Sequence, residues 1–318
     1  MTRVLVTGGA GFIGSHTVDA LLARGDEVWV LDNFNDFYDP AIKRANAAAF
    51  SGAHVVEGDL RDEACLDALF AEGQFDGVIH LAAMAGVRPS LVDPLLYEDV
   101  NVRGTLLLLE RIRRCEGCRF VFASSSSVYG SNEDVPFKED DDIHHPVSPY
   151  AATKRAGELH AFTYHHLYGI PTSCLRFFTV YGPRQRPEMA IHKFVRMTLA
   201  LEALPFFGDG TTARDYTYID DIVQGVVAAL DRCDGYEIYN LGESQTTSLA
   251  ELVETIAAAL ETEVVLDKQP MQPGDVVITY ADVSKARERL DYAPQVLIPE
   301  GVARFIDWYR TEGPGVKA

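Results

Sequence analysis

The segment Thr7-Gly8-Gly9-Ala10-Gly11-Phe12-Ile13-Gly14 follows a short apolar run, Arg3 to Val6, and leads directly into a helical pattern that continues to Arg24. Glycines at positions 8, 11 and 14 permit a tight turn, a close approach of backbone amides to a pyrophosphate and close packing of the helix on the strand. The spacing is GxxGxxG rather than GxGxxG. A strand, a glycine-rich turn and a helix in this order predict the first unit of a parallel sheet that binds a dinucleotide.

The rest of the first half alternates short apolar runs with amphipathic stretches. After Arg3 to Val6, further strands are expected at Glu27 to Leu31, His54 to Val56, Gly77 to Leu81, Phe120 to Ala123 and Thr172 to Phe177. Apolar residues at three- and four-residue spacing predict helices at Ile13 to Arg24, Asp62 to Phe70, Pro94 to Arg114 and Tyr150 to Tyr168. This alternation predicts an α/β fold, a doubly wound parallel (Rossmann) sheet with helices on both faces.

The pattern changes after Tyr181, where glycines and prolines from Gly182 to Gly210 separate shorter elements. We therefore expect a dinucleotide-binding domain over residues 1–180 and a smaller α/β substrate-binding lobe over residues 181–318. Ile219 to Leu230 and Glu237 to Leu241 again look like a helix and a buried strand, so residues 219–242 are expected to return to the first domain. The two domains are thus predicted to be interleaved.

Composition excludes several classes of partner. The chain has 318 residues and a net charge of -19, which repels nucleic acid and anionic membranes. No apolar run approaches the roughly 20 residues that span a bilayer, and because Met1 is followed directly by an expected strand we expect no signal sequence. The odd number of five cysteines indicates reduced thiols and a cytoplasmic location. A run of acidic residues and histidines from Asp140 to His145 reads as a solvated loop, and no metal site is expected.

Several residues are expected to hold the dinucleotide beside Gly8, Gly11, Phe12, Ile13 and Gly14. Asp32 closes the second strand 18 residues after Gly14, where a carboxylate can accept both ribose hydroxyls and would repel a 2′-phosphate, which favours NAD over NADP. The other candidates follow strands, at the sheet edge where doubly wound folds bind ligands. They are Asn33, Asp59, Leu60, Leu81, Ala82 and Ala83. Three residues of expected helices, Asn101, Tyr150 and Lys154, are also expected to contact the cofactor.

Tyr150 and Lys154 are four residues apart in an expected helix and so lie on one face. A tyrosine is a poor base at neutral pH, and a neighbouring cation would stabilise its phenolate. Ser124 to Ser127 follow a strand and face the same crevice, and Ser125 is the hydroxyl expected to complete a proton relay with Tyr150. Asn101, within a helix, either organises this relay or satisfies local backbone groups.

Taken in order, these motifs follow the pattern of one family. The sequence resembles an extended short-chain dehydrogenase/reductase of the NAD-dependent epimerase/dehydratase family along nearly its whole length. The matching segments are the glycine turn, Asp32, His80-Leu81-Ala82-Ala83, the serine run, YxxxK and Arg214 to Asp221. The resemblance implies that Tyr150 removes the proton of a sugar's 4-hydroxyl while hydride passes to NAD, and that the ketone turns over and takes hydride back on its other face.

Further segments resemble UDP-glucuronate 4-epimerases. Dehydratases and decarboxylases of the family carry acidic residues where this chain has Ser125 to Ser127, and an elimination needs such groups. UDP-glucose 4-epimerases usually carry asparagine where Thr179 stands. The segments nearest to the glucuronate enzymes are Asn33 to Pro40, Ala85 to Arg88, Arg176 to Pro183 and Arg186 to Ala190. The preferred substrate is UDP-glucuronate, converted to UDP-galacturonate; the alternatives are a UDP-glucose 4-epimerase and a non-catalytic NAD-binding sensor or scaffold.

The resemblance also implies a set of substrate contacts. Hydroxyls of Ser125, Ser126 and Thr179, with Arg186 or Arg88 as cation, are expected to hold the sugar carboxylate. Ser127, Met189 and Ala190 belong to the same matching segments. For the nucleotide, the family pattern carries Arg214 and Lys193 to the diphosphate, Phe207 to uracil and Asp275 to the uridine ribose. Gln185 and Glu188 stand where glycine and aspartate are commoner, and a homodimer through the helices at Pro94 to Arg114 and Tyr150 to Tyr168 is expected.

Overall fold

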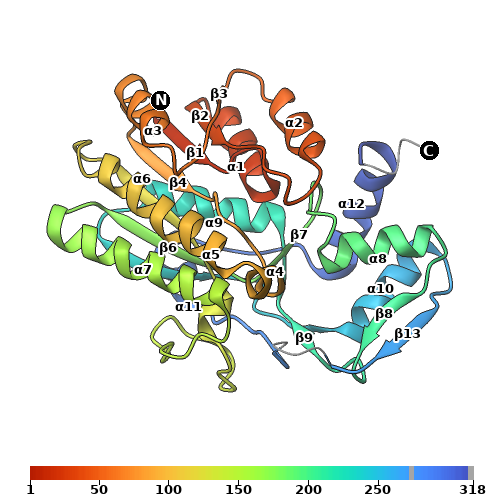
Figure 1. Cartoon of the computed structure of the whole chain (residues 1–318). Coiled ribbons are helices and arrows are strands. Elements are labelled where there is room, and N and C mark those ends of the chain that lie inside the picture. The colour runs from red at the N-terminus through yellow and green to blue at the C-terminus, as the bar shows by residue number, and fades with distance from the viewer. Residues whose placement is uncertain (272–275, 314–318) are drawn as a thin grey trace.

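The computed structural model describes residues 1–271 and 276–313. Within these residues the central sheet has seven strands, all paired in parallel (Figure 1). In spatial order they are β11 (Tyr236–Leu241), β6 (Thr172–Phe177), β5 (Arg119–Ser125), β4 (Gly77–His80), β1 (Arg3–Thr7), β2 (Glu27–Asp32) and β3 (His54–Glu57). The chain reverses direction across the sheet between β1 and β4, the switch point where such sheets bind ligands. The predicted doubly wound parallel sheet is confirmed.

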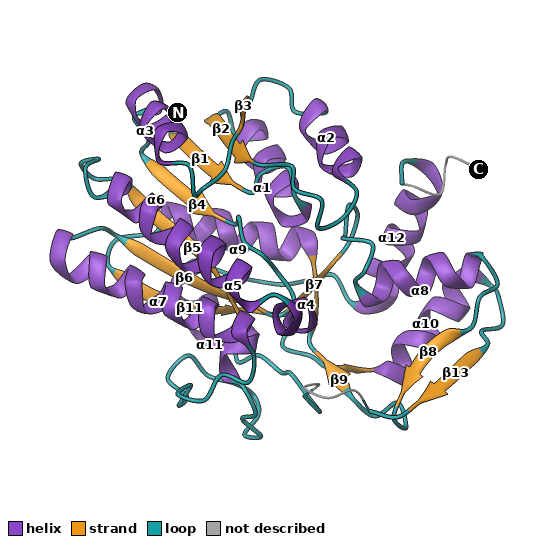
Figure 2. Ribbon diagram, in the orientation of Figure 1, coloured by secondary structure: helices purple, strands orange, loops and turns teal. Residues whose placement is uncertain are grey.

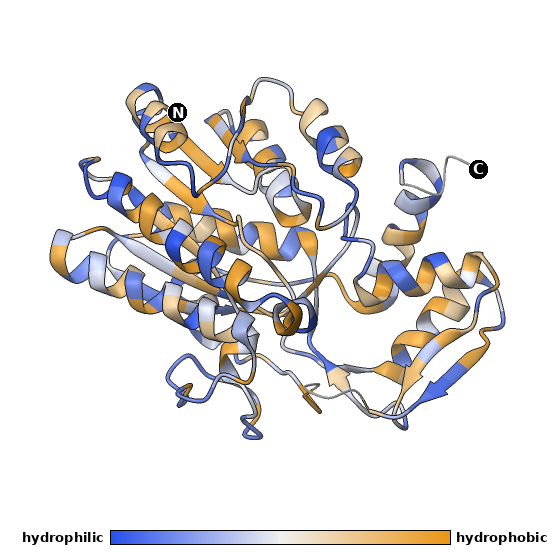
Figure 3. Ribbon diagram, in the orientation of Figure 1, coloured by the Kyte–Doolittle hydropathy of each residue, from blue (hydrophilic) through white to orange (hydrophobic). Residues whose placement is uncertain are grey.

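Side chains alternate between the two faces of the sheet, and each face has its own core. Val4 and Val6 pack with residues of α1 (Phe12–Ala23) and α9 (Ile219–Asp231), whereas Leu5 belongs to the core on the other face. That other core is covered by α3 (Glu63–Gly73), α6 (Gly104–Ile112) and α7 (Pro149–Tyr168) (Figure 2). The central strands are accordingly largely apolar (Figure 3). Both faces of the sheet are therefore buried against helices, and this packing holds the ends of the strands, where a ligand site is expected, in fixed positions.

The helix expected over Pro94 to Arg114 is interrupted. It consists of α5 (Pro94–Tyr97), a π-helical segment (Glu98–Arg103) and then α6. Asn101 lies in the π-helical segment, where its Oδ1 accepts from the backbone N of Met84 at 2.8 Å and its Nδ2 donates to the Met84 carbonyl at 3.0 Å. Bulges of this kind occur often at functional sites. Here the bulge presents the Asn101 amide to the loop that follows β4.

A second group of elements lies beside the carboxyl ends of the strands (Figure 1). Its parallel pair of short strands, β8 (Leu204–Phe207) and β13 (Leu266–Gln269), is accompanied by α8 (Ala190–Leu199), α10 (Leu249–Leu260) and α12 (Ile298–Thr311). The remaining elements are α2 (Pro40–Ala48), α4 (Val87–Val92), a 3₁₀ turn (Ser126–Tyr129), β7 (Thr179–Tyr181), β9 (Ala213–Arg214), β10 (Tyr216–Tyr218), β12 (Thr247–Ser248) and α11 (Ser284–Leu290). In the described part of the chain, none of the helices has the length and apolar character needed to cross a bilayer.

Candidate active site

The glycine turn between β1 and α1 fits closely against the loop after β4. Gly8 has φ +68°, and a Cβ atom there would lie 2.7 Å from the backbone N of Ala82. A Cβ atom at Gly14 would overlap the carbonyl oxygen of Gly8. No side chain caps the start of α1, whose N-cap is Gly11. The turn therefore leaves the backbone amides at this helix start open to an anion such as a pyrophosphate.

Asp32 ends β2 and lines the same cavity as the glycine turn. Its carboxylate accepts from the backbone N of Phe34 at 2.9 Å and from that of Ala10 at 3.2 Å. Burial raises the pKa of Asp32, and these amides and the charge of Lys43 oppose the increase. The carboxylate is thus fixed in position, and its remaining lone pairs can accept hydroxyl groups.

Asp59 is committed to its neighbours. Arg61 donates to both carboxylate oxygens at 2.9 Å, and Asn33 Nδ2 donates to Oδ2 at 2.9 Å. The hydrogen bonds from Arg61 hold the pKa of Asp59 far below its usual range. Sequence reasoning missed Arg61, although an arginine two residues after an acid at a strand end is a detectable signal. Asp59 and Asn33 therefore line the cavity as a hydrogen-bonded pair whose position is fixed by Arg61.

A buried histidine supports the loop after β4 from beneath. The two ring nitrogens of His80 lie 2.7 Å from Thr7 Oγ1 and 2.9 Å from Thr105 Oγ1, and Thr7 Oγ1 in turn accepts from the backbone N of Ala82 at 3.3 Å. Burial lowers the pKa of His80 to about 3, so the ring is neutral. The His80 bridge connects β1, β4 and α6 directly below the small residues that face the glycine turn.

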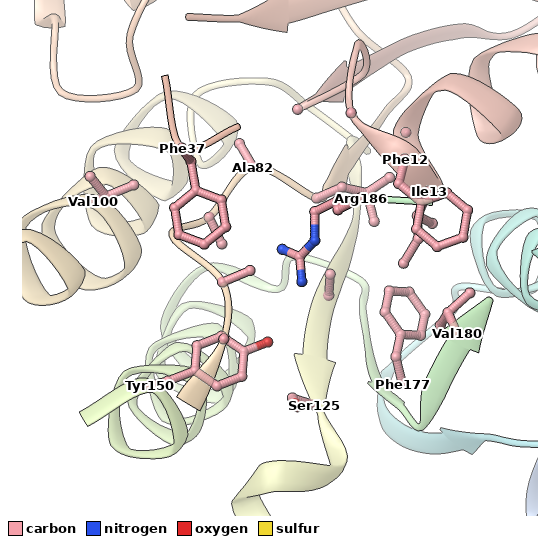
Figure 4. Close-up of a pocket in the computed structure, with 18 of the residues that line it drawn as sticks. Phe12, Ile13, Phe37, Ala82, Val100, Ser125, Tyr150, Phe177, Val180 and Arg186 are labelled. Carbon is pink, nitrogen blue, oxygen red and sulfur yellow. The ribbon is translucent and has the colours of Figure 1, made fainter. Parts of the chain in front are cut away.

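These parts enclose a cavity of about 460 Å³ that runs from β2 across the switch point to α7 and the loop after β7 (Figure 4). It brings together most of the residues expected from the sequence. Those that line it are Gly8, Gly11, Phe12, Ile13, Gly14, Asp32, Asn33, Asp59, Leu60, Leu81, Ala82, Ala83, Ser125, Ser126, Ser127, Tyr150, Lys154, Thr179, Arg186 and Met189.

Lys154 is fixed by the end of β5. Its Nζ donates to the carbonyl of Ala123 at 2.7 Å and lies 5.9 Å from the centre of the Tyr150 ring. The side chain of Ser148 caps the start of α7 by accepting from the backbone N of Ala151, which orients the first turn and with it Tyr150. Burial lowers the pKa of Lys154 to about 7. Its ammonium charge is therefore easily lost, and a nearby anion would stabilise it.

Tyr150 faces the cavity at the opposite end from Asp32. Burial raises its pKa, while a hydrogen bond from Ser125 and the charge of Arg186 oppose the increase. The sequence led us to expect a lowered pKa caused by Lys154. Desolvation dominates instead, and the Lys154 ammonium donates to the carbonyl of Ala123. Burial thus favours the neutral form of the Tyr150 hydroxyl, and a positive charge placed beside it would favour the phenolate.

The four serines take different directions. Ser124, which also lines the cavity, donates its Oγ hydrogen to Glu158 Oε1 at 2.6 Å. Ser125 Oγ accepts from the backbone N of Ser127 at 3.1 Å and lies 3.1 Å from Ser127 Oγ. Ser125, Ser126 and Ser127 line the cavity beside Tyr150. Asn101 does not line it, but its Nδ2 lies 3.1 Å from Thr153 Oγ1, so it connects the Met84 loop to the helix that carries Tyr150.

Behind the serines lies a buried ion pair that the sequence did not reveal. Glu158 and Arg176 join at 2.9 Å between Oε1 and Nε and at 3.1 Å between Oε2 and Nη2, with side chains 0% and 1% exposed. Arg176 stands in β6 among apolar residues, which was the available signal. Because Ser124 is paired with Arg176 in the sheet and bonded to Glu158, the ion pair fixes α7 against the end of β5.

Arg186 extends into the cavity, and the Tyr150 hydroxyl turns toward the same space (Figure 4). The Nε atom of Arg186 lies 3.1 Å from Glu188 Oε1, and the Arg186 guanidinium lies 5.7 Å from the centre of the Phe37 ring. Thr179 and Met189 line the same end. This end of the cavity therefore combines hydroxyl groups with the guanidinium of Arg186, a suitable lining for a small polar or anionic group.

The remaining expected substrate residues lie outside the cavity lining. The Arg88 guanidinium lies 5.5 Å from the centre of the Phe207 ring, so these two residues contact each other across α4 and β8. Arg214 Nη1 donates to the carbonyl of Ala213 at 2.9 Å in β9. Ala190 and Lys193 belong to the first turn of α8. Asp275 lies outside the described residues, and the roles of this group stay predictions.

A family model described as GDP-mannose 4,6 dehydratase matches residues 5–305. The chain belongs to this family of extended short-chain dehydrogenases/reductases. UDP-glucuronate 4-epimerase 3 of Arabidopsis thaliana is 44% identical over 96% of this chain and 76% of that protein. UDP-glucuronate 4-epimerase of Thermodesulfobacterium geofontis is 42% identical over 97% of this chain and 96% of its own length.

Solved structures of extended short-chain dehydrogenases/reductases share this fold throughout. UDP-glucuronic acid 4-epimerase from Bacillus cereus, in complex with UDP-glucuronic acid and NAD, superimposes with a TM-score of 0.90 at 36% identity, covering 96% of this chain and 98% of that chain. UDP-glucose 4-epimerase of Thermus thermophilus, in complex with NAD, gives a TM-score of 0.90 at 34% identity, with 98% of this chain and 99% of that chain covered. The resemblance inferred from the sequence is confirmed.

Proposed function

We propose that this chain is an NAD-dependent 4-epimerase of UDP-sugars that interconverts UDP-glucuronate and UDP-galacturonate through a 4-keto intermediate. The observation that carries the proposal is the lining of one end of the cavity by Tyr150, the serines and Arg186. Among the described residues, the carboxylates that line the cavity are Asp32 and Asp59, both at its other end. A dehydration would need an acid beside the sugar, whereas epimerisation does not.

The residues of the proposed reaction act on protons and on position. Bound NAD, held by the glycine turn and Asp32, would supply the hydride chemistry at carbon 4. Tyr150, once it is a phenolate, would accept the proton of the 4-hydroxyl and give it back to the same oxygen, and the hydroxyl of Ser125, which lines the cavity beside Tyr150, would orient that oxygen. Lys154 adds positive charge once the phenolate forms. The sugar would turn over between the two hydride steps, and the proton and hydride taken from it would be returned to it, so one turnover neither consumes nor releases a proton.

The cavity suits NAD on physical grounds. A Cβ atom at Gly8 or Gly14 would clash with the backbone of Ala82 or of Gly8, so the tight turn that presents the backbone amides needs these glycines, and Asp32 keeps lone pairs for ribose hydroxyls. Asp32 would repel a 2′-phosphate, which favours NAD over NADP. We assign this half of the cavity, with residues 1–180 and 219–242, to the cofactor, and the remaining elements of residues 181–318 to the UDP-sugar.

A glucuronate substrate places one demand on the sugar end. Oxidation at carbon 4 creates a β-keto acid, which loses carbon dioxide unless its carboxylate is held in an unproductive orientation. Ser126, Thr179 and Arg186 offer two hydroxyls and a cation for that purpose. Beyond the cavity, we assign Phe207 to the uracil face and Arg214 to the diphosphate.

A product assay tests the proposal. Purified protein is incubated separately with UDP-glucuronate and with UDP-glucose, and the UDP-sugars are separated by ion-exchange chromatography. We expect UDP-galacturonate from the first. Turnover of UDP-glucose alone would replace the proposal by the second candidate, a UDP-glucose 4-epimerase. The observation that favours this candidate is the ion pair of Arg186 with Glu188, because Glu188 neutralises the cation that would otherwise attract a sugar carboxylate.

We also propose a homodimer, located in the cytoplasm. Large apolar side chains are exposed on α4, α5 and α7, with Leu95 at 79% and Phe162 at 50%. Leu91, Val92 and Leu159 are exposed as well, and α4 and α5 both pack against α7, which carries Leu159 and Phe162. Sedimentation at micromolar concentration should give twice 35.1 kDa, and a Phe162→Glu variant should shift it toward the monomer. The free thiols of all five cysteines support the location.

A further inference from the structure

The cation at the sugar end of the cavity already has an anionic partner on its own loop. Arg186 Nε and Glu188 Oε1 are 3.1 Å apart, and the two side chains are 21% and 44% exposed. The charge of Glu188 also acts on Tyr97, a neighbour of the catalytic Tyr150. Burial raises the pKa of Tyr97 to about 12, and the charges of Tyr150 and Glu188 add to that increase. Tyr97 packs edge-on against the Tyr150 ring, with 6.2 Å between ring centres.

The loop that carries this pair is fixed at its base by Gln185. The Gln185 side chain is 2% exposed; its Nε2 donates to the carbonyl of Val180 at 3.1 Å, and its Oε1 accepts from the backbone N of His192 at 3.1 Å. The side chain thus ties the end of β7 to α8 across the loop. The backbone next to Arg186 is therefore held in place, so Arg186 can change partners only by rotating its side chain.

A sugar carboxylate that uses Arg186 must compete with Glu188. The Glu188 charge both occupies the guanidinium and repels an incoming carboxylate. A neutral hydroxymethyl group meets neither obstacle, because it can accept one hydrogen bond from Arg186 while the ion pair stays intact. The pair therefore affects acidic and neutral sugars differently.

We propose that Glu188 is a specificity-determining residue, which competes with the sugar carboxylate for Arg186 and thereby limits the preference for acidic over neutral UDP-sugars. The inference rests on the proposed function, since it takes Arg186 as the carboxylate ligand. A partly exposed ion pair shifts an equilibrium by about two- to fivefold. Removal of the Glu188 charge should therefore tighten UDP-glucuronate binding by that factor and leave UDP-glucose binding within experimental error.

The test measures binding in a Tyr150→Phe background, so that no conversion of substrate occurs during titration. Dissociation constants for UDP-glucuronate and UDP-glucose are determined by calorimetry on the NAD-loaded protein, with and without Glu188→Gln. The matched control is Asp19→Asn. Asp19 pairs at 2.7 Å with Arg184, which belongs to the same loop as Arg186, and the side chains of Asp19 and Arg184 are 41% and 26% exposed, close to the values for Glu188 and Arg186. Arg184 does not line the cavity. We expect the affinity ratio to change about two- to fivefold in Glu188→Gln and not in Asp19→Asn.

An Arg186→Met variant shows whether Glu188 acts through Arg186. In that background Glu188→Gln should no longer change the ratio, because the cation for which the two carboxylates compete is gone. An unchanged ratio in Glu188→Gln, or an equal change that persists in Arg186→Met, overturns the inference. The proposed function is tested separately with protein that retains Tyr150. Failure to convert UDP-glucuronate refutes the epimerase, while the binding ratio still decides the role of Glu188.

Discussion

Glu158→Gln should destabilise the protein more than any exposed ion-pair variant. The substitution keeps the size of the side chain and removes its charge. Arg176 then remains buried at 1% exposure with a neutral partner in place of the carboxylate that it meets at 2.9 and 3.1 Å. Glu158 also loses the charge that accepts from Ser124 at 2.6 Å and from Arg155 at 2.9 Å.

The magnitude follows from the burial of the guanidinium. Breaking one side of a buried pair costs about 3–5 kcal/mol, because an uncompensated charge is left behind. Arg176 keeps two neutral acceptors, the Tyr129 hydroxyl at 3.0 Å and the Glu139 carbonyl at 3.1 Å, so the lower end, about 3 kcal/mol, applies. At about 2–4 °C per kcal/mol, the melting temperature should fall by roughly 6 to 12 °C.

Thermal unfolding followed by circular dichroism measures this change. The control is Glu300→Gln, which removes an exposed partner of Arg304 on α12, with side chains 57% and 45% exposed, and should cost at most about 1 kcal/mol. A Glu158→Leu, Arg176→Met double variant removes both charges and should recover part of the loss. A Glu158→Gln protein that melts as Glu300→Gln does would refute the reasoning.

Three further predictions concern catalysis, cofactor choice and pH. Tyr150→Phe should lower kcat by about 10²- to 10⁴-fold while UDP-sugar binding persists, and a rate near that of the wild type would remove the mechanism. Asp32→Asn should reduce the discrimination between NAD and NADP at least about tenfold in fluorescence titrations, because the charge that repels a 2′-phosphate is lost; an unchanged ratio would contradict this. Burial and the charges of Asp221 and Asp215 raise the pKa of Glu243 from 4.5 to about 7. Since this pKa is higher in the folded state, its contribution to stability is present at low pH and is lost as pH rises through that window. Glu243→Gln should therefore gain about 1 to 2 kcal/mol over the wild type between about pH 5 and about pH 8, measured by thermal unfolding; a difference that is constant with pH would contradict this.

The sequence predicted those parts of the site that depend on local spacing. The glycine turn follows from three residues between one strand and one helix, and the adjacency of Tyr150 and Lys154 follows from helical periodicity. The parallel sheet followed from the alternation of strands and helices. Each of these features is determined within a few tens of residues.

Features that depend on distant pairing were not predicted. The Glu158–Arg176 pair requires α7 to pack on β5 and β6 in one register, with Ser124 opposite Arg176. The π-helical segment at Asn101 depends on a contact with Met84, 17 residues away. The direction of the Tyr150 pKa shift was also missed, because desolvation depends on how closely other elements surround the ring.

The negative net charge of the chain determines what an anionic ligand must displace in order to bind. With a net charge of -19, arginines near the cleft tend to have acidic partners, as Arg61 has Asp59 and Arg186 has Glu188. A phosphate or carboxylate must then exchange with an internal partner, so its binding energy is the difference between two ion pairs. Such differences are small for a partly exposed pair and large for a buried one. Substrate choice should therefore respond to Glu188, at the rim, and the stability of the fold to Glu158, in the core.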